Sequence, residues 1–490
     1  MQTHLSVLIV SILLMNSSIH SQPVQLSTLE AAVEALDRDP AMKSANWGIT
    51  VMQVRSGKVL MNHQGHKSLA TASTMKIVST ATALAVLGPN HRFETFLEYS
   101  GQITAEGELN GNVYIRGSGD PSLGSDRFGE SYEFETILAQ WVEEIQALGV
   151  RKISGEIIGD ASCYGSQLTP PKWPWEDMGN YYGAGAGGLN IHENKYRLDL
   201  KPGSRQGDKT SVVGTYPEQS SIRFQNEILT GKPGSGDNGY IYGSPYTHLR
   251  YLRGTIPPGK PVFSIKGSIP DPALYAAESL QKALGKAGID CRRLASTVRL
   301  GADNSQTRTR ISTHQSPRLQ DIAYQTNQYS VNLYAEALAL AAGAALNSKG
   351  NTSSALDAIE SYWSRQGLST SGMYLRDGSG LSPNNVLSPY QLTGLLQKVA
   401  LSPYFEAFDA SLPVAGRSGS LKRMMRGTAA EGNLRAKSGY ISGVRGYAGY
   451  VEAPNGELLA FAMIANYYSC SASQMRQKLS RLMVRLAEAR

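Results

Sequence analysis

The sequence predicts an α+β fold in which one antiparallel sheet, flanked by helices, is split by a large β-rich insertion. Helix and strand patterns gather near both ends of the chain, at 47–87 and 434–490. Between them, residues 96–270 are dense in Gly, Ser and Pro, and short β segments alternate there with turns. The 490 residues are 41% hydrophobic and 18% charged, which is typical of a folded protein and too apolar for disorder. The two ends can therefore share one sheet around an inserted part.

An apolar run from Leu5 to Met15 predicts a secretory signal peptide over residues 1–21. The run is too short to span a membrane, which takes about 20 residues, and Ser17, Ser18 and Ser21 supply small residues for cleavage after Ser21. No Lys or Arg precedes the run, so a buried N-terminal helix is the alternative. We expect an exported, periplasmic or otherwise extracytoplasmic protein with no integral membrane segment after signal removal.

Residues 22–95 are expected to form the first part of the split domain. Ser27 and Glu30 have the spacing of a capping box at the start of a helix. A hairpin pattern and then an apolar helical pattern follow, at 47–54 with 58–62 and at 73–87.

Residues 96–270 are expected to form one or two small inserted domains. Strands are expected at 112–116 and 153–158, and the segment 231–243 is rich in turn-forming residues. The GSGDPSLG sequence at 117–124 lacks the Lys-[Ser/Thr] of a phosphate-binding loop, so we interpret it as a structural turn.

Residues 271–490 are expected to complete the split domain. Helical patterns at 272–288 and 331–346 precede three strands at 434–440, 445–451 and 458–465. A final helical pattern at 475–490 places five apolar side chains on one face, namely Met475, Leu479, Leu482, Met483 and Leu486. Because strands adjoin it directly, we expect this helix to pack on the sheet; a membrane-surface helix is the alternative.

Composition narrows the classes of partner and cofactor. The net charge of +7 suits an anionic polymer or an acidic peptide, and no basic patch with interleaved aromatic residues indicates nucleic-acid binding. Cys163, Cys291 and Cys470 allow at most one disulfide bridge, and buried free thiols are the favoured interpretation. His63 and His66 form a close pair without a Glu at metalloprotease spacing, so no metal or other cofactor is expected.

Ser73 and Lys76 lie three residues apart at the start of a predicted helix. Residues at this spacing share one helix face, so the Lys76 amine can reach the Ser73 hydroxyl. A serine alcohol needs a base beside it, and lysine can be that base if burial or a neighbouring cation lowers its pKa. A Ser-x-x-Lys match alone is weak, because Ser73 could simply cap the helix.

Two further motifs follow in order along the chain. Ser330 and Asn332 precede a helix, and Lys437 begins a Lys-Ser-Gly sequence on a predicted strand. Ser330 could relay a proton to the leaving amine, and Asn332 could hold the Lys76 ammonium and a substrate amide. Lys437 could depress the pKa of Lys76 and attract a terminal carboxylate. This ordered set of three motifs marks penicillin-binding proteins and serine β-lactamases.

The residues after Lys437 are candidate substrate-binding groups. Ser438 could hydrogen-bond the terminal carboxylate, and Gly439 would let the substrate backbone approach the strand edge. The backbone N–H groups of Ser73 and Tyr440 are candidates for an oxyanion hole. Taken singly, these residues could equally be helix caps or an exposed strand end.

The likeness to known enzymes extends beyond the three motifs. Other segments carry it, in the order RGSGDPSL (116–123), GEIIGDAS (155–162), WPWEDMGNYYGAGAGGLNIHEN (173–194), GSIPDPALYAA (267–277), SVNLYAEAL (330–338), RDGSGLSPNN (376–385) and LPVAGRSGSL (412–421). With these segments the chain resembles the class C low-molecular-mass penicillin-binding proteins, which are D-alanyl-D-alanine carboxypeptidases/endopeptidases of the penicillin-binding protein 4 type.

The resemblance implies a transpeptidase/β-lactamase-like domain, split between the first two motifs. It also implies a serine D,D-peptidase without a cofactor, which removes terminal D-Ala from peptidoglycan peptides, cuts D-Ala crosslinks, or does both. Penicillins and other β-lactams would acylate Ser73. Three positions depart from the family: Val331 replaces a frequent Asp, Pro383 a common Arg, and Ser438 the usual Thr. Pro383 puts the preference for the substrate side chain in question, but not the reaction.

Two other functions stay open from the sequence. One is a serine β-lactamase or esterase on the same core, and the other is a catalytically silent wall-binding protein. Asp160 and Asp377 lie in segments shared with the family, and we interpret them as turn or domain-interface anchors rather than as reacting acids.

Overall fold

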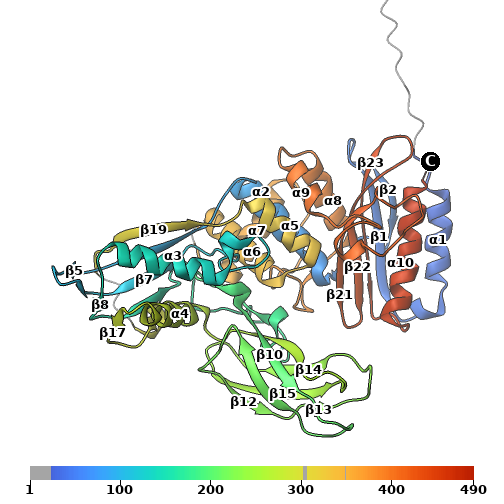
Figure 1. Ribbon diagram of the computed structural model, residues 1–490. Helices are drawn as coiled ribbons and strands as arrows, with labels where there is room; N and C mark the ends of the chain where they lie inside the picture. Colours follow the sequence, from blue (N-terminus) through green and yellow to red (C-terminus); the bar gives the residue numbers. More distant parts are fainter. Residues whose placement is uncertain (1–23, 302–305, 348, 490) are drawn as a thin grey trace, which may run out of the picture.

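The computed structural model describes residues 24–301, 306–347 and 349–489. The expected signal peptide at 1–21 lies outside these residues. Within them, no helix is both long and apolar enough to cross a bilayer. The molecule is elongated: a large sheet stands at one end, a group of helices lies in the middle, and two further bodies extend from the other side (Figure 1).

The large sheet joins the two ends of the chain, as the sequence predicted. Its five strands have the order β2-β1-β23-β22-β21, and every neighbouring pair is antiparallel. They are β1 (Asn46–Gln53), β2 (Val59–His63), β21 (Arg435–Ile441), β22 (Val444–Glu452) and β23 (Leu458–Asn466). β21 is the last strand of the sheet, so its outer side is an edge. The α+β class with an antiparallel sheet is therefore confirmed.

Helices cover both faces of this sheet (Figure 1). One face packs on α1 (Ser27–Asp37) and α10 (Ala472–Ala487), and the five apolar residues predicted to share a face of the final helix are all buried there. The other face packs on a helical group, consisting of α2 (Lys76–Leu87), α5 (Leu319–Tyr329), α6 (Asn332–Asn347), α7 (Thr352–Arg365), α8 (Pro389–Ala400) and α9 (Phe405–Ser411). A two-stranded ladder, β3 (Leu69–Ala70) with β20 (Val386–Leu387), ties the segment before α2 to this group.

The capping box expected at Ser27 and Glu30 is wrong. Helix α1 begins one residue earlier than that motif requires, with Leu26 at the capping position and no side chain that caps the helix. Ser27 is thus already a helical residue, and the start of α1 is held by burial of Leu26 and Leu29 rather than by a side-chain hydrogen bond.

The insertion extends further than the expected range 96–270. Its first sheet has the order β18-β9-β7-β4-β19, so the chain enters by β4 and leaves by the adjacent, antiparallel β19. The strands are β4 (Glu94–Tyr99), β7 (Val113–Gly117), β9 (Ile157–Asp160), β18 (Ser296–Thr297) and β19 (Thr309–Gln315). The insertion also has its own helices, α3 (Phe134–Ala147) and α4 (Pro272–Lys286), which share one core with this sheet. The helical pattern at 272 therefore belongs to the insertion and does not mark the return to the split domain.

Smaller sheets complete the insertion. A four-stranded sheet contains β5 (Gln102–Ile103), β6 (Glu108–Asn110), β8 (Lys152–Ile153) and β17 (Asp290–Cys291). The strand expected at 153–158 is in fact two strands, β8 and β9, in different sheets, because residues 154–156 cross between them.

A separate β body projects from the insertion (Figure 1). One sheet has β10 (Lys195–Lys201), β11 (Ser211–Tyr216) and β16 (Phe263–Ser268), and the other has β12 (Arg223–Asn226), β13 (Leu229–Thr230), β14 (Asn238–Tyr242) and β15 (Leu249–Ile256). They enclose a small core of their own. β14 lies within the turn-rich segment 231–243, where the sequence indicated no strand.

The three cysteines are free thiols. Cys163 is exposed, and Cys291 and Cys470 are partly buried, so the expectation of buried thiols is wrong for Cys163.

Candidate active site

Ser73 lies on a 3₁₀ turn, Ala72–Met75, that leads directly into α2. The segment before this turn is fixed to β23 by Asn466, whose side chain accepts from Ala70 N (2.8 Å) and donates to Ala70 O (3.1 Å). The helix expected from residue 73 thus begins at Lys76. Ser73 sits one turn ahead of it, where backbone N–H groups have no partner within the helix.

Lys76 is fully buried, and its Nζ donates to three oxygens. These are Ser73 Oγ at 2.9 Å, Asn332 Oδ1 at 2.6 Å and the main-chain oxygen of Ser379 at 2.7 Å. The contact with Ser73 follows from the three-residue spacing, whereas Asn332 and Ser379 are distant in the sequence. The first two motifs therefore meet at one lysine nitrogen.

Burial lowers the pKa of Lys76 from its usual 10.5 to about 7, while the carboxyl groups of Asp377 and Glu336 oppose this shift. The sequence had left burial and a neighbouring cation, Lys437, as the two possible causes of a depressed pKa. Removal from water is instead the main cause, because an ammonium without hydration is disfavoured relative to the neutral amine.

The partners of Lys76 suit its neutral form. Asn332 Oδ1 and the Ser379 carbonyl can only accept hydrogen bonds. A neutral amine has two N–H donors, which these two oxygens take up. The remaining lone pair then faces the Ser73 hydroxyl, which can donate to it. The site thus orients a neutral Lys76 to receive the proton of Ser73.

Ser330 and Asn332 lie at the junction of α5 and α6. Ser330 follows the last residue of α5 in a left-handed backbone conformation, with φ of 58°, and Asn332 begins α6. Asn332 Nδ2 donates to the main-chain oxygen of Tyr182 (2.7 Å), which turns the amide oxygen toward Lys76. One Nδ2 proton remains for a substrate carbonyl.

Lys437 is fully buried on the edge strand β21. Its Nζ donates to Ser330 Oγ (3.0 Å) and to the main-chain oxygen of Ser438 (2.8 Å). Burial lowers the pKa of Lys437 well below its usual value, and the charge of Lys76 lowers it further. Lys437 of the third motif therefore contacts Ser330 of the second motif directly, and its charge interacts with that of Lys76 in the first motif.

The remaining predicted residues follow Lys437 along β21. Ser438 Oγ donates to Ser420 Oγ (2.7 Å). Tyr440 is half-exposed, and the Arg445 guanidinium lies 4.2 Å from the centre of its ring.

Gly439 has a structural reason in addition to the expected approach of a substrate backbone. A Cβ at this position would lie only 2.6 Å from the main-chain oxygen of Thr71 and 3.2 Å from Ser73 N. The glycine lets β21 pack against the turn that carries Ser73. The absence of a side chain is thus needed for contact within the protein, before any substrate arrives.

Asp377 is a buried anchor, in line with its interpretation from the sequence. Its carboxylate accepts from the main-chain nitrogens of Gly380 (2.6 Å) and Ser382 (2.6 Å), and so shapes the loop whose Ser379 carbonyl contacts Lys76. It also accepts from Trp173 Nε1 of the insertion (2.8 Å). Burial raises the pKa of this carboxyl.

Four contacts of the site were not predicted from the sequence. Two are main-chain oxygens, of Ser379 and Tyr182, which no side-chain motif can indicate. The third is Glu336, a buried carboxyl that accepts from Gly378 N (2.8 Å) and whose pKa burial raises to about 8. The fourth is Ser420. All four lie within segments that carried the family resemblance, so those segments were the available signal.

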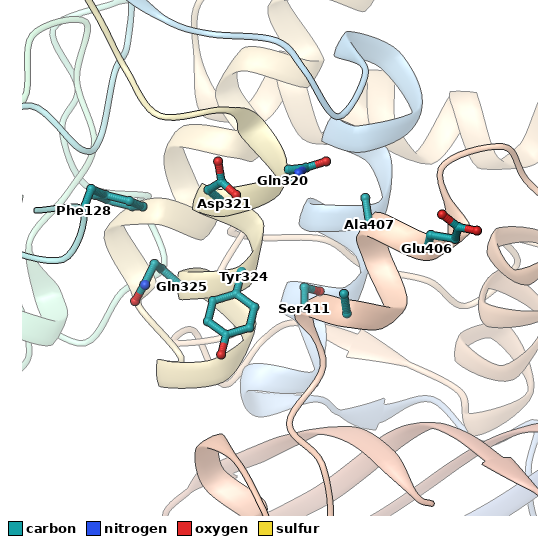
Figure 2. A pocket seen from close by; sticks show the side chains of 9 residues that line it. Phe128, Gln320, Asp321, Tyr324, Gln325, Glu406, Ala407 and Ser411 are labelled. Carbon is teal, nitrogen blue, oxygen red and sulfur yellow. The ribbon is translucent and has the colours of Figure 1, made fainter.

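A cavity of about 430 Å³ lies elsewhere, between α5 and α9. Figure 2 shows Asp321 and Tyr324 of α5, Glu406 of α9 and Phe128 of the insertion around it. It contains no residue of the three motifs, so we assign it no part in the reaction.

A serine alcohol beside a buried lysine, next to the edge strand of an antiparallel sheet, defines the class of penicillin-recognising serine enzymes. Residues 29–489 match the D-Ala-D-Ala carboxypeptidase 3 (S13) family. The chain belongs to this family and is a serine-type D,D-peptidase.

Individual relatives agree with this assignment. A D-alanyl-D-alanine carboxypeptidase of Actinomadura sp. (strain R39) is 30% identical over 476 residues, which cover 95% of this chain and 85% of the relative. D-alanyl-D-alanine carboxypeptidase DacB of Haemophilus influenzae is 24% identical, with 89% and 88% covered. The crystal structure of penicillin binding protein 4 from Haemophilus influenzae has the same fold, with a TM-score of 0.78, 22% identity, and 95% of this chain and 98% of that chain covered.

Proposed function

We propose that this chain hydrolyses D-alanyl peptide bonds of peptidoglycan through an acyl-enzyme on Ser73, with Lys76 as the base. The observation that carries the proposal is the buried Lys76 Nζ, 2.9 Å from Ser73 Oγ, whose other two partners can only accept hydrogen bonds. This arrangement supports proton transfer from the alcohol to the amine.

In the first half-reaction, Ser73 Oγ attacks the carbonyl carbon of the penultimate D-Ala while its proton passes to Lys76. The oxyanion that forms accepts from the N–H groups of Ser73 and Tyr440. Ser330, which links to Lys437, relays the proton now held by Lys76 to the leaving nitrogen, so Lys76 returns to its neutral form. The C–N bond then breaks, which leaves an ester on Ser73 and a free amine.

In the second half-reaction, water attacks the ester carbonyl and gives its proton to neutral Lys76. The acid is released, and Ser73 regains its hydroxyl hydrogen. Lys437 and Ser438 hold the carboxylate of the leaving residue only during the first half-reaction, before the C–N bond breaks. The nearby Asn332 amide donates to a substrate carbonyl.

The substrates we propose are peptidoglycan stem peptides that end in D-Ala-D-Ala, and D-Ala crosslinks between stems. This rests on the family match and on the full-length likeness to a D-alanyl-D-alanine carboxypeptidase. β-Lactams would acylate Ser73 as mimics of the terminal dipeptide. Such substrates lie outside the cytoplasm, which agrees with the export signal and periplasmic location expected from residues 1–21.

The test is to label the protein with a fluorescent penicillin and to locate the adduct by mass spectrometry. We expect one adduct, on Ser73, and none in Ser73→Ala. Ser56→Ala is the matched control, because Ser56 lies in the exposed β1–β2 turn. An adduct elsewhere, or retained peptidase activity in Ser73→Ala, would overturn the proposal.

A further inference from the structure

A cleft of about 770 Å³ lies between α10 and the segment 419–425. Four exposed cations line it, Lys422 and Arg423 from the segment and Arg476 and Arg481 from α10, and no acidic residue does. Such a concentration of positive charge attracts carboxylates or phosphates, and guanidinium groups bind them in a two-pronged geometry.

The cations that line the cleft differ in their partners from other cations of α10. Farther along α10, Lys478 is paired with Asp39 and Arg485 with Glu488. Among the ion pairs of the described residues, none involves the four cations that line the cleft. The charge of these four cations is therefore available to an anion that enters the cleft.

Ser420 connects this cleft to the catalytic centre. It lines the cleft and accepts from Ser438 Oγ at 2.7 Å, and the Ser438 carbonyl accepts from Lys437 Nζ. In the proposed reaction, the carboxylate of the leaving residue binds Lys437 and Ser438. The cleft therefore adjoins the position at which that residue would be held.

The carboxypeptidase and endopeptidase reactions differ in how far the leaving group extends beyond the residue that Ser438 holds. In the carboxypeptidase reaction the leaving group is a single D-Ala, which ends at Ser438. In the endopeptidase reaction it is the amine-bearing residue of a second stem peptide, and that peptide carries further carboxylates. Only the second leaving group is long enough and negative enough to occupy the cleft.

We propose that this basic cleft binds the carboxylate-bearing leaving stem of crosslinked peptidoglycan and so favours endopeptidase cleavage. The inference rests on the proposed function and specifies its substrate. A concave site that Ser420 links to the catalytic strand β21 suits a peptide better than a flat membrane surface.

The experiment compares Arg423→Gln/Arg481→Gln with the unaltered protein on two substrates: a crosslinked muropeptide dimer and a monomeric pentapeptide ending in D-Ala-D-Ala. We expect the ratio of kcat/KM for the dimer to that for the pentapeptide to fall about tenfold. The ratio should also fall with added salt in the unaltered protein, because exposed charges are screened. Arg423→Lys/Arg481→Lys should keep most of the ratio.

The matched control is Arg55→Gln/Arg365→Gln, which removes the same charge from exposed positions outside the cleft and should leave the ratio unchanged. An unchanged ratio in the cleft variant, with penicillin still labelling Ser73, overturns the cleft inference alone. Weaker binding of that variant to phosphatidylglycerol vesicles, with the ratio unchanged, overturns it in favour of a membrane contact. Absence of labelling at Ser73 in the unaltered protein overturns the proposed function itself.

Discussion

The turn that carries Ser73 and the strand β21 each bury a lysine, but they place it in different surroundings. Lys76 donates to three oxygens, and burial lowers its pKa to about 7 against the opposing effect of two buried carboxyl groups. Lys437 donates to two oxygens, and both burial and the charge of Lys76 lower its pKa. An ammonium has three donors, so Lys437 has one left for a ligand.

This difference separates the two tasks that the reaction needs. Lys76 has all its partners before substrate arrives, which suits a base that only exchanges a proton with Ser73. Lys437 keeps one unused hydrogen-bond donor until a substrate carboxylate binds. The negative charge of that carboxylate would raise the pKa of Lys437 and so stabilise its ammonium form. Substrate binding would thereby charge Lys437, and the charge would in turn favour neutral Lys76.

The largest effect is expected for Lys76→Gln. This variant keeps a polar group beside Ser73 but removes the base, so acylation by penicillin and release of D-Ala should both fall by about 10³- to 10⁴-fold. Stopped-flow labelling measures the first rate and chromatography the second. Thermal unfolding of the variant checks that the fold is intact. A smaller loss than that in Lys437→Gln would contradict the assignment of the base.

Lys437→Gln should have a smaller and more selective effect. Loss of a hydrogen bond between charged groups removes about 1.5–3 kcal/mol, which corresponds to a decrease of about 10- to 150-fold in kcat/KM for a peptide with a free terminal carboxylate. The same peptide with a terminal amide should be hydrolysed at nearly equal rates by both proteins. If kcat/KM falls by the same factor for both peptides in the variant, Lys437 does not act on the carboxylate.

Gly439→Ala tests the contact that brings the two regions together. The new Cβ would lie 2.6 Å from Thr71 O, so β21 and the Ser73 turn must separate. We expect the free energy of unfolding to fall by about 1–3 kcal/mol and penicillin acylation to slow. Gly214→Ala is the matched control, since Gly214 lies in strand β11 and a Cβ added there would have nothing within 4 Å. Equal stability of the two variants, measured by denaturant unfolding, would refute the packing argument.

The mildest test is the pH dependence of acylation. Only neutral Lys76 can accept the proton, and its pKa is about 7. The rate constant for penicillin labelling should therefore rise about tenfold per pH unit below 7 and level off above it. A charged Glu336 would raise the pKa of Lys76, but burial raises the pKa of Glu336 itself to about 8, so Glu336→Gln should move the midpoint only slightly, to lower pH. A midpoint that moves to higher pH in this variant would contradict the expectation that Glu336 raises the pKa of Lys76.

Much of the fold followed from local patterns in the sequence. The alternation at 434–465 and the apolar face at 475–486 predicted β21, β22, β23 and α10, because each pattern is long and is buried against one partner. The same reasoning failed where an element depends on its neighbours. Helix α4 has an ordinary amphipathic pattern, and only its packing in the core of the insertion shows to which body it belongs.

The groups of the site also divide into those that the sequence could predict and those that it could not. Ser73, Lys76, Ser330, Asn332 and Lys437 could be chosen from the sequence because their side chains and spacing are distinctive, and the structure brings them together. Main-chain oxygens carry no residue identity, so the partner that Ser379 provides to Lys76 could not be chosen in this way. The main cause of the lowered pKa of Lys76, its complete burial, is likewise a property of the folded chain.

The contacts of Tyr182 and Trp173 make the insertion part of the reaction machinery. The Tyr182 carbonyl sets the orientation of Asn332, and the Trp173 indole holds Asp377, which shapes the loop beneath Lys76. Excision of the insertion would leave the Asn332 amide free to rotate, and the buried Asp377 carboxylate would lack one hydrogen-bond donor. A chimera that exchanged this module for that of a relative would have to restore both contacts before it regained turnover.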